Sequence, residues 1–275
     1  MDRYAVFGNP IAQSKSPAIH SEFSRQSGQK LVYEKQLVDV DQFKKAADDF
    51  FQQGGLGLNI TVPFKLDAFA YATQLTPRAK TAGAVNTLKK CEDGSILGDN
   101  TDGQGLVDDI MINHHRVLKD KRVLILGAGG AVRGVLQPIL LQQPREIVIA
   151  NRTLNKAEAL VEEFESFGCV KACEFLTLDD QPFDVVINGT SASLSGQLPP
   201  LSSSILTPES FCFDMMYSSE PTVFLKWAKL QGCDNLADGL GMLVGQAAES
   251  FYVWRGVKPE TQELIKSIRA QLQST

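Results

Sequence analysis

Residues 122–131 read RVLILGAGGA, an apolar run that ends in a glycine-rich turn. The four apolar residues from Val123 to Leu126 are typical of a strand buried within a parallel sheet. Glycines let the backbone approach a pyrophosphate, and the first N–H groups of a following helix can donate to it. Val132 stands where the usual third glycine would be. The turn therefore indicates a dinucleotide site, with a plain strand-to-helix turn as the alternative.

Strand-like and helix-like segments alternate on both sides of this turn, which predicts an α/β protein with a parallel sheet. Strands are expected at 4–8, 33–38, 56–62, 122–126, 146–150, 184–188 and 211–214, with a hairpin at 87–99. Helices are expected from 16 onward and at 40–53, 64–73, 103–113, 130–142, 154–167, 242–254 and 261–273. We predict an N-terminal α/β substrate domain over 1–102, a Rossmann-like nucleotide domain over 103–238, and C-terminal helices over 239–275 that return to the first domain.

Composition excludes several classes of protein. The 275 residues carry a net charge of -5 without any Lys/Arg-rich run, so nothing favours nucleic acid as a partner. No apolar run approaches the roughly 18 residues that span a bilayer, and the first residues indicate a strand rather than a secretory signal. Five cysteines without C-x-x-C spacing, and three histidines without ligand spacing, predict reduced thiols, a cytoplasmic location and no metal.

Basic residues follow the strand expected at 146–150. In NAD sites an acidic residue about 20 positions after the glycine turn binds the ribose 2′-hydroxyl, whereas basic residues suit a 2′-phosphate. Here the strand ends in Asn151-Arg152-Thr153, with Lys156 close behind and no carboxylate. A guanidinium can fork onto a phosphate or lie flat on adenine. The pattern favours NADP, with a solvated basic helix start as the alternative.

Two polar segments that precede the turn are candidates for proton transfer. In Asn59-Ile60-Thr61-Val62-Pro63, alternation places Asn59 and Thr61 on one face of a strand. Lys65 follows in a first helical turn, where a cation is unfavourable, so it is either functional or an ordinary exposed lysine. Asp102 begins the helix at 103–113 and is either its N-cap or the partner of Lys65. An ammonium can stabilise the alkoxide that forms during carbonyl reduction and donate a proton to it.

A third polar segment lies near the N-terminus, where Ser14-Lys15-Ser16-Pro17 opens a helix. Pro17 suits the first helical position, so Ser16 is expected as the N-cap. The hydroxyls of Ser14 and Ser16, together with the helix N–H groups, suit a small carboxylate or polyol.

Taken in order along the chain, these segments resemble the shikimate dehydrogenase family. The motifs that carry the resemblance are Gly8-Asn9-Pro10-Ile11, Ser14-Lys15-Ser16-Pro17, Asn59 to Lys65, Gly83-Ala84-Val85-Asn86-Thr87, Asp99-Asn100-Thr101-Asp102-Gly103, the Gly127 turn, Asn151-Arg152-Thr153 and Asp238-Gly239-Leu240-Gly241-Met242. They extend from residue 8 to beyond residue 246, which is nearly the whole chain.

The resemblance implies reversible, NADPH-dependent reduction of 3-dehydroshikimate to shikimate, a step towards chorismate and the aromatic amino acids. It implies that Lys65 and Asp102 are the catalytic pair, in a cleft between the two domains. The substrate carboxylate and hydroxyls would be bound by Ser14, Ser16, Asn59, Thr61, Lys65, Asn86, Asp102, Tyr217 and Gln246. The cofactor side would be formed by Gly127, Ala128, Gly129, Gly130, Ala131, Asn151, Arg152, Thr153, Lys156, Met215, Gly239 and Met242.

Two departures from the family pattern affect the site. Pro77 stands where relatives can carry an acidic residue near the cofactor, so it is left out of the site. The segment Asn188-Gly189-Thr190-Ser191-Ala192-Ser193 lacks the family's last glycine, which leaves the contacts of Thr190 and Ser191 open. A quinate/shikimate dehydrogenase with relaxed cofactor use and a catalytically silent binding protein remain alternatives. Monomer and homodimer are both open, and a close Lys–Asp pair titrates as a unit, so neither side chain is singled out as the proton carrier.

Overall fold

A computed structural model describes residues 1–178, 181–190, 192 and 196–274 of the chain. The chain forms two compact units. The first contains residues 1–105 and 243–264, and the second contains residues 106–242 and 265–275. The sequence placed all of residues 239–275 with the first domain, whereas in the structure the contacts divide this segment between the two units.

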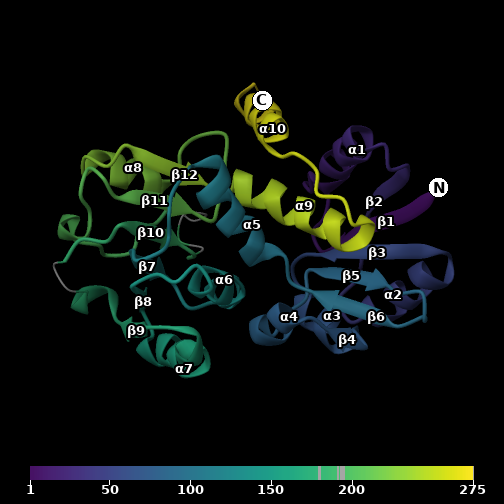
Figure 1. Cartoon of the computed structure of the whole chain (residues 1–275), viewed down its shortest axis with the longest axis horizontal. Coiled ribbons are helices and arrows are strands. Elements are labelled where there is room, and N and C mark those ends of the chain that lie inside the picture. The colour runs from purple at the N-terminus through teal and green to yellow at the C-terminus, as the bar shows by residue number, and fades with distance from the viewer. Residues whose placement is uncertain (179–180, 191, 193–195, 275) are drawn as a thin grey trace. The chain divides into compact units, whose positions relative to one another are not determined.

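The first unit is built on a six-stranded mixed sheet with the order β2-β1-β3-β5-β6-β4 (Figure 1). Its strands are β1 (Asp2–Gly8), β2 (Leu31–Leu37), β3 (Gly55–Ile60), β4 (Gln74–Leu75), β5 (Thr87–Lys90) and β6 (Ile96–Asp99). Its helices are α1 (Ser16–Ser27), α2 (Phe43–Gln52), α3 (Lys65–Tyr71), α4 (Pro77–Ala82), the start of α5 (Asp102–Asp108) and most of α9 (Leu240–Arg255). β1, β2 and β3 pair in parallel, and β5 and β6 form the antiparallel hairpin that the sequence predicts.

The second unit contains a six-stranded parallel sheet with the order β12-β11-β10-β7-β8-β9. Its strands are β7 (Arg122–Leu126), β8 (Glu146–Ala150), β9 (Val170–Cys173), β10 (Val185–Asn188), β11 (Phe211–Asp214) and β12 (Asn235–Asp238). Its helices are the end of α5, the π-helix η1 (Asp109–Asn113), α6 (Gly130–Leu140), α7 (Leu154–Phe164), α8 (Val223–Leu230) and most of α10 (Gln262–Gln273), with short 3-10 turns η2 (Glu165–Phe167), η3 (Phe175–Thr177) and η5 (Ser203–Ile205). Counted from β7, this order is 3-2-1-4-5-6, the doubly wound Rossmann arrangement.

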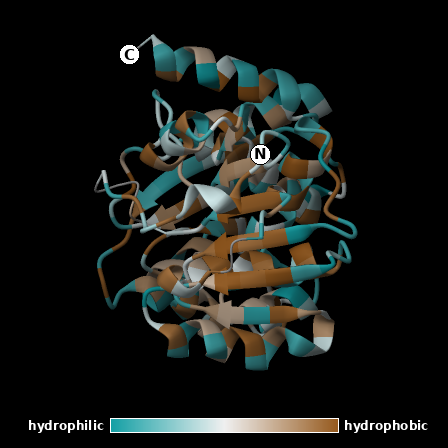
Figure 2. Ribbon diagram, turned by 90° about the vertical axis from the view of Figure 1, so that its left-hand side faces the viewer, coloured by the Kyte–Doolittle hydropathy of each residue, from teal (hydrophilic) through white to brown (hydrophobic). Residues whose placement is uncertain are grey.

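Both faces of the second sheet are buried, which explains the continuous apolar run of β7. Val123 and Ile125 pack into one hydrophobic cluster with α6 and α7, while Leu124 and Leu126 pack into another with α8. Successive side chains of a strand point to opposite faces, so a sheet covered by helices on both sides needs apolar residues at every position. In Figure 2 the strands are accordingly mostly brown, and the outer helices carry both brown and teal residues.

The structure differs from the sequence predictions mainly at the ends of elements and in short elements. α1 begins at Ser16 with Lys15 as its N-cap, so the prediction of Ser16 as the cap was wrong. The helix expected at 103–113 is interrupted, because α5 gives way to the π-helix η1 after Asp108. The sequence reading also missed the short elements β4, α4, β9, α8 and β12. In the described part of the chain, no helix is long and apolar enough to cross a membrane.

Candidate active site

Lys65 and Asp102 meet in the first unit, although 37 positions separate them. Lys65 is the first residue of α3, directly after the turn that contains the cis bond Val62–Pro63, and Asp102 is the first residue of α5. Their Nζ and Oδ2 atoms are 2.5 Å apart, with 33% of the lysine side chain and 18% of the aspartate side chain exposed. The ammonium is therefore paired and still reachable from solvent, as a proton donor to a bound molecule must be.

Asp102 does not cap its helix. Its Oδ2 accepts from Lys65, and its Oδ1 accepts from Asn86 Nδ2 at 2.8 Å. The turn before the helix is closed by Asn100, whose Oδ1 accepts from the N–H of Asp102 at 3.2 Å. Both carboxylate oxygens thus have side-chain donors, and the capping alternative for Asp102 is not what the structure shows.

The Asn86 amide is oriented by its neighbours. Its Oδ1 accepts from the N–H of Thr101 at 2.9 Å and from the Thr87 hydroxyl at 2.8 Å. Its Nδ2 therefore faces Asp102, and also lies 3.5 Å from Gln246 Oε1 on α9. A residue 160 positions further along the chain thus reaches the same polar cluster.

Ser14 and Ser16 lie together at the start of α1, where the N–H of Ser16 donates to Ser14 Oγ at 3.3 Å. Because the Ser14 oxygen accepts this bond, its own hydrogen remains available to an outside acceptor. Thr61, between β3 and α3, is half-buried, and its methyl group lies so close to Gly8 that a β-carbon there would stand only 2.4 Å away. Any side chain at position 8 would therefore displace Thr61 from its position.

Asn59 is more deeply placed than a simple contact residue, with 6% of its surface exposed. Its Oδ1 accepts from the Tyr33 hydroxyl at 2.7 Å, and its Nδ2 donates to the Ser250 hydroxyl at 2.9 Å. Both ends of the Asn59 amide are hydrogen-bonded to other side chains of the protein. These side chains are far away in the sequence, so the local sequence pattern could not predict the bonds.

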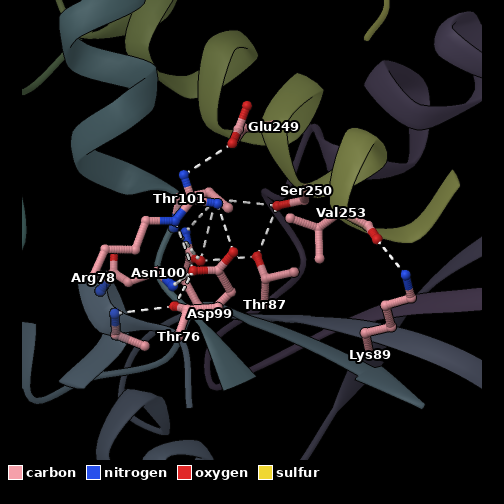
Figure 3. A network of polar contacts seen from close by, with 12 residues as sticks. Thr76, Arg78, Thr87, Lys89, Asp99, Asn100, Thr101, Glu249, Ser250 and Val253 are labelled. Carbon is pink, nitrogen blue, oxygen red and sulfur yellow. Dashed lines mark hydrogen bonds and ion pairs between the residues drawn. The ribbon is translucent and has the colours of Figure 1, made fainter. Parts of the chain in front are cut away.

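The sequence reading also missed a buried ion network behind the loop that carries Asp102. Arg78 donates through Nε and Nη2 to the two oxygens of Asp99, at 2.7 and 2.5 Å, and through Nη1 to Glu249 at 2.9 Å (Figure 3). Burial alone would raise the pKa of Asp99, but the hydrogen bonds and charge of Arg78 outweigh it and the pKa is lowered. Asp99 also accepts from the N–H of Asn100 and so fixes the start of the loop. The only sequence signal for this ion network was an arginine in a polar turn.

The glycine turn in the second unit suits a phosphate. Gly127 has φ +101, in the left-handed region that favours glycine. A β-carbon on Gly129 or Gly130 would meet nothing within 4 Å, so open space lies beside the first turn of α6. Ala128 is half-buried and Ala131 is exposed at this turn. Val132, in contrast, is fully buried and replaces the third glycine by packing in the core.

The basic residues after β8 have no partner in the described part of the chain. Arg152 and Lys156 are exposed, whereas Asn151 is half-buried and donates from Nδ2 to the carbonyl of Thr153 at 2.8 Å. Thr153 is the N-cap of α7 without a side-chain capping bond. Two cations at a helix start without acidic partners fit a bound phosphate better than a solvated helix start, because the helix dipole disfavours them there.

The remaining cofactor candidates follow β11 and β12. Gly239 packs so tightly that a β-carbon would lie 2.1 Å from the carbonyl oxygen of Met215, and Met215 and Met242 both pack on the core cluster of α6 and α7. Tyr217 lies in the same unit, and burial, then the charge of Asp238, raises the pKa of its hydroxyl. Thr190 donates to Asn188 Oδ1, while Ser191 and Ser193 lie outside the described residues.

The described residues contain no metal cluster, and their main hollow lies away from the glycine turn. Within the described residues, no group of three His, Cys, Asp or Glu side chains is arranged to hold a metal. A hollow of about 770 Å³ lies at the amino ends of β7, β8, β10 and β11, at the opposite end of the strands from the glycine turn. Its charges are largely paired internally, Lys121 with Asp184 and Arg122 with Glu146, which leaves little for a ligand.

Comparison with known proteins identifies the chain's relatives. Three family models match it: the shikimate dehydrogenase substrate binding domain over residues 6–88, Shikimate / quinate 5-dehydrogenase over 110–195, and the Shikimate 5'-dehydrogenase C-terminal domain over 239–269. A shikimate dehydrogenase (NADP(+)) of Cellvibrio japonicus is 61% identical, over 98% of each chain.

Two solved structures extend the comparison. The Ael1 enzyme of Pseudomonas putida superimposes with a TM-score of 0.93 at 47% identity, over 97% of this chain and 98% of that one. The shikimate 5-dehydrogenase of Thermus thermophilus, solved with NADP(H) and shikimate, gives a TM-score of 0.87 at 30% identity, over 99% of this chain and 100% of that one.

Proposed function

The chain belongs to the shikimate dehydrogenase family, and we propose that it catalyses the reversible NADPH-dependent reduction of 3-dehydroshikimate to shikimate. The observation that carries this proposal is the 2.5 Å pair of Lys65 and Asp102, fixed by Asn86 and still reachable from solvent. A pair held in this way can stabilise the charge that develops on a ketone oxygen during its reduction and supply a proton to it. The reaction is a step towards chorismate and the aromatic amino acids.

Lys65 and Asp102 together carry out the proton transfer. Lys65 Nζ stabilises the negative charge that develops on the ketone oxygen and supplies the proton to that oxygen. Such stabilisation and proton donation are typically worth about 10²–10⁴-fold in rate. Asp102 holds the ammonium in place and accepts a hydrogen bond from a substrate hydroxyl.

The remaining polar groups bind the substrate. The hydroxyls of Ser14 and Ser16 receive the carboxylate, and Thr61, Asn86 and Gln246 take the ring hydroxyls. Asn59 supports these residues from inside the protein, in keeping with its engaged amide. A carboxylate that meets hydroxyl donors at a helix N-terminus is favourably placed.

The second unit has the features of an NADP site. The open space at Gly129 and Gly130 leaves room for the pyrophosphate on the turn from Gly127 to Ala131. Asn151, Arg152, Thr153 and Lys156 would hold the adenosine 2′-phosphate, and Met215, Gly239 and Met242 complete the site. When bound, the cofactor supplies the hydride. Structures of relatives are named as complexes with NADP, which supports this assignment.

The test is a spectrophotometric assay of the purified protein with shikimate and quinate, each against NADP and NAD. We expect NADP reduction that depends on shikimate. Preference for NAD, or equal use of quinate, would favour a quinate/shikimate dehydrogenase instead. Ligand binding without turnover would favour a catalytically silent binding protein.

We also propose that the enzyme works in the cytoplasm on this small-molecule substrate, without nucleic acid or membrane partners. All five cysteines are free, and Cys212 and Cys233 remain thiols with their sulfurs only 3.8 Å apart. Free thiols at such a distance are in keeping with a reducing compartment. Monomer and homodimer both fit these observations.

A further inference from the structure

Hydrogen bonds join the backbone of Lys65 to the backbone of Asp102, in addition to the bond between their side chains. The carbonyl of Lys65 accepts from the N–H of Val85 at 3.0 Å. The carbonyl of Ala84, which belongs to the same peptide group as this N–H, accepts from Asn100 Nδ2 at 3.1 Å. Asn100 Oδ1 in turn accepts from the N–H of Asp102 at 3.2 Å. One peptide group and one side-chain amide therefore link the two backbones.

The orientation of the Asn100 amide follows from its two partners. The N–H of Asp102 can only donate and the carbonyl of Ala84 can only accept, so the amide oxygen faces the first and the amide nitrogen faces the second. Asn100 is only 3% exposed, and a buried donor or acceptor that lacks a partner is costly. The amide therefore has one favourable orientation, in which it holds both backbones.

The peptide group between Ala84 and Val85 carries this constraint to Lys65. A trans peptide group is planar and rigid, and its C=O and N–H point in opposite directions. Because Asn100 holds the C=O, the N–H on the other side is also fixed, and this N–H bonds with the carbonyl of Lys65. The 2.5 Å bond between Lys65 Nζ and Asp102 Oδ2 closes these hydrogen bonds into a ring.

Asn100 is also fixed at its own backbone. Its N–H donates to Asp99 Oδ1 at 2.7 Å, and Arg78 Nε and the Thr76 hydroxyl donate to the same oxygen at 2.7 and 2.6 Å (Figure 3). The buried ion network thus places the backbone from which the Asn100 side chain reaches Ala84.

We propose that Asn100 is a positioning residue for the proton transfer: its amide sets the separation of Lys65 and Asp102, because it binds the N–H of one and the peptide group that holds the other. This inference rests on the proposed function, since that function makes Lys65 and Asp102 the pair that moves the proton. Asn100 acts through this pair and needs no contact with substrate or cofactor.

The test compares two variants of Asn100. Asn100→Ala removes both side-chain bonds, whereas Asn100→Ser keeps an oxygen that can accept from the N–H two residues on, without a donor that reaches Ala84. We expect kcat with shikimate and NADP to fall about 100-fold in Asn100→Ala and about tenfold in Asn100→Ser, because a misplacement of about 1 Å can cost up to the larger factor. KM for NADP should change less than about twofold, since neither variant alters a group that binds the cofactor.

The matched control is Ser210→Ala in the second unit. Ser210 is also buried and also joins two backbone groups: its Oγ donates to the carbonyl of Phe183 at 2.7 Å and accepts from the N–H of Thr207 at 2.9 Å. It lies just before β11, at the end of the sheet away from the glycine turn. This variant should lose stability in urea unfolding but keep the kcat of the parent.

A double-mutant cycle separates positioning from general loss of stability. If Asn100 acts through the catalytic pair, Asn100→Ala should lower kcat little further in a Lys65→Ala background, because the group that it positions is already gone. If Asn100→Ala does not fold, Asn100→Ser takes its place in the cycle. Parent-like kcat in the Asn100 variants, full additivity with Lys65→Ala, or an equal loss of kcat in Ser210→Ala would overturn the inference. A parent enzyme without shikimate-dependent turnover would overturn the proposed function instead.

Discussion

The carboxylate of Asp109 lies against the α-carbon of Gly241, so close that a β-carbon on Gly241 would stand 1.9 Å from Asp109 Oδ1. Asp109 lies in the π-helix η1 with 1% of its surface exposed and accepts a bond from the N–H of Met242. Burial, opposed by the Asn113 hydrogen bond and reinforced by Asp238, raises its pKa to about 6. A buried carboxyl thus supports the first turn of α9, where the helix dipole favours its anion.

Replacing Gly241 with alanine should therefore destabilise the protein by about 1–3 kcal/mol, the usual cost of overpacking a buried site. Urea unfolding followed by fluorescence measures this. Adding Asp109→Ala should recover part of the loss, because the added methyl group then has room. Gly130→Ala is the matched control: its β-carbon meets nothing within 4 Å, so stability should be unchanged. If the double variant loses as much stability as the two single variants together, the contact between residues 241 and 109 is not the cause of the loss.

Lys65→Ala should lower kcat by about 10²–10⁴-fold and change KM for shikimate little, because the ammonium acts mainly when charge develops on the ketone oxygen. Steady-state kinetics with shikimate and NADP measure both constants. Lys45→Ala removes an exposed lysine paired with Asp49 and should behave as the parent. Near-normal turnover in Lys65→Ala would remove Lys65 from the proton transfer.

Cofactor choice should depend on Arg152 and Lys156. Hydrogen bonds to charged groups are worth about 1.5–3 kcal/mol, roughly 10–150-fold. Changing both residues to glutamine should lower kcat/KM for NADPH by at least this factor and leave that for NADH nearly constant. Arg145→Gln, an exposed change at the amino end of β8, is the control. An equal loss with both cofactors would argue against a 2′-phosphate contact.

Burial of His20 should make stability fall in mild acid. Desolvation, only partly offset by the hydrogen bond to Asn59, lowers its pKa from 6.5 to about 3. Between these values the unfolded chain binds a proton that the folded chain does not, so the free energy of unfolding decreases as pH falls from 6.5 towards 3. His20→Gln, which can still donate to Asn59, should show a shallower slope in this window. Equal slopes for the two proteins in urea titrations at pH 7, 6, 5 and 4 would contradict this assignment.

The fold was predictable where its signals are local. The apolar run before Gly127, with its helix and the next strand, is confirmed because a strand covered on both faces needs apolar residues at every position. The short strand β12 and helix α8 escaped prediction, since segments of four and eight residues carry little periodic signal.

The candidate site was predictable in its residue types but not in its orientations. Local rules left Asp102 as either a helix cap or the partner of Lys65, and its partners in the structure, Lys65 and Asn86, lie 37 and 16 positions away. For Asn59, the sequence predicted only the face of the strand on which the side chain lies. Its hydrogen bond to Ser250 joins residues that are 191 positions apart in the chain. Long-range hydrogen bonds of this kind leave no spacing pattern in the sequence. The site residues were therefore predicted largely from the family resemblance.

The discontinuous first unit has a consequence for biosynthesis. Thr101 bonds with Ser250, and 149 positions separate them, so the whole sheet of the second unit is translated between the two partners. At the usual elongation rate this takes on the order of 10 s, during which Thr101 and Asn59 lack a partner that they have in the native state. The nascent N-terminal sheet must therefore wait for the ribosome to deliver α9, and a ribosome stalled before residue 243 would expose an unfinished substrate domain.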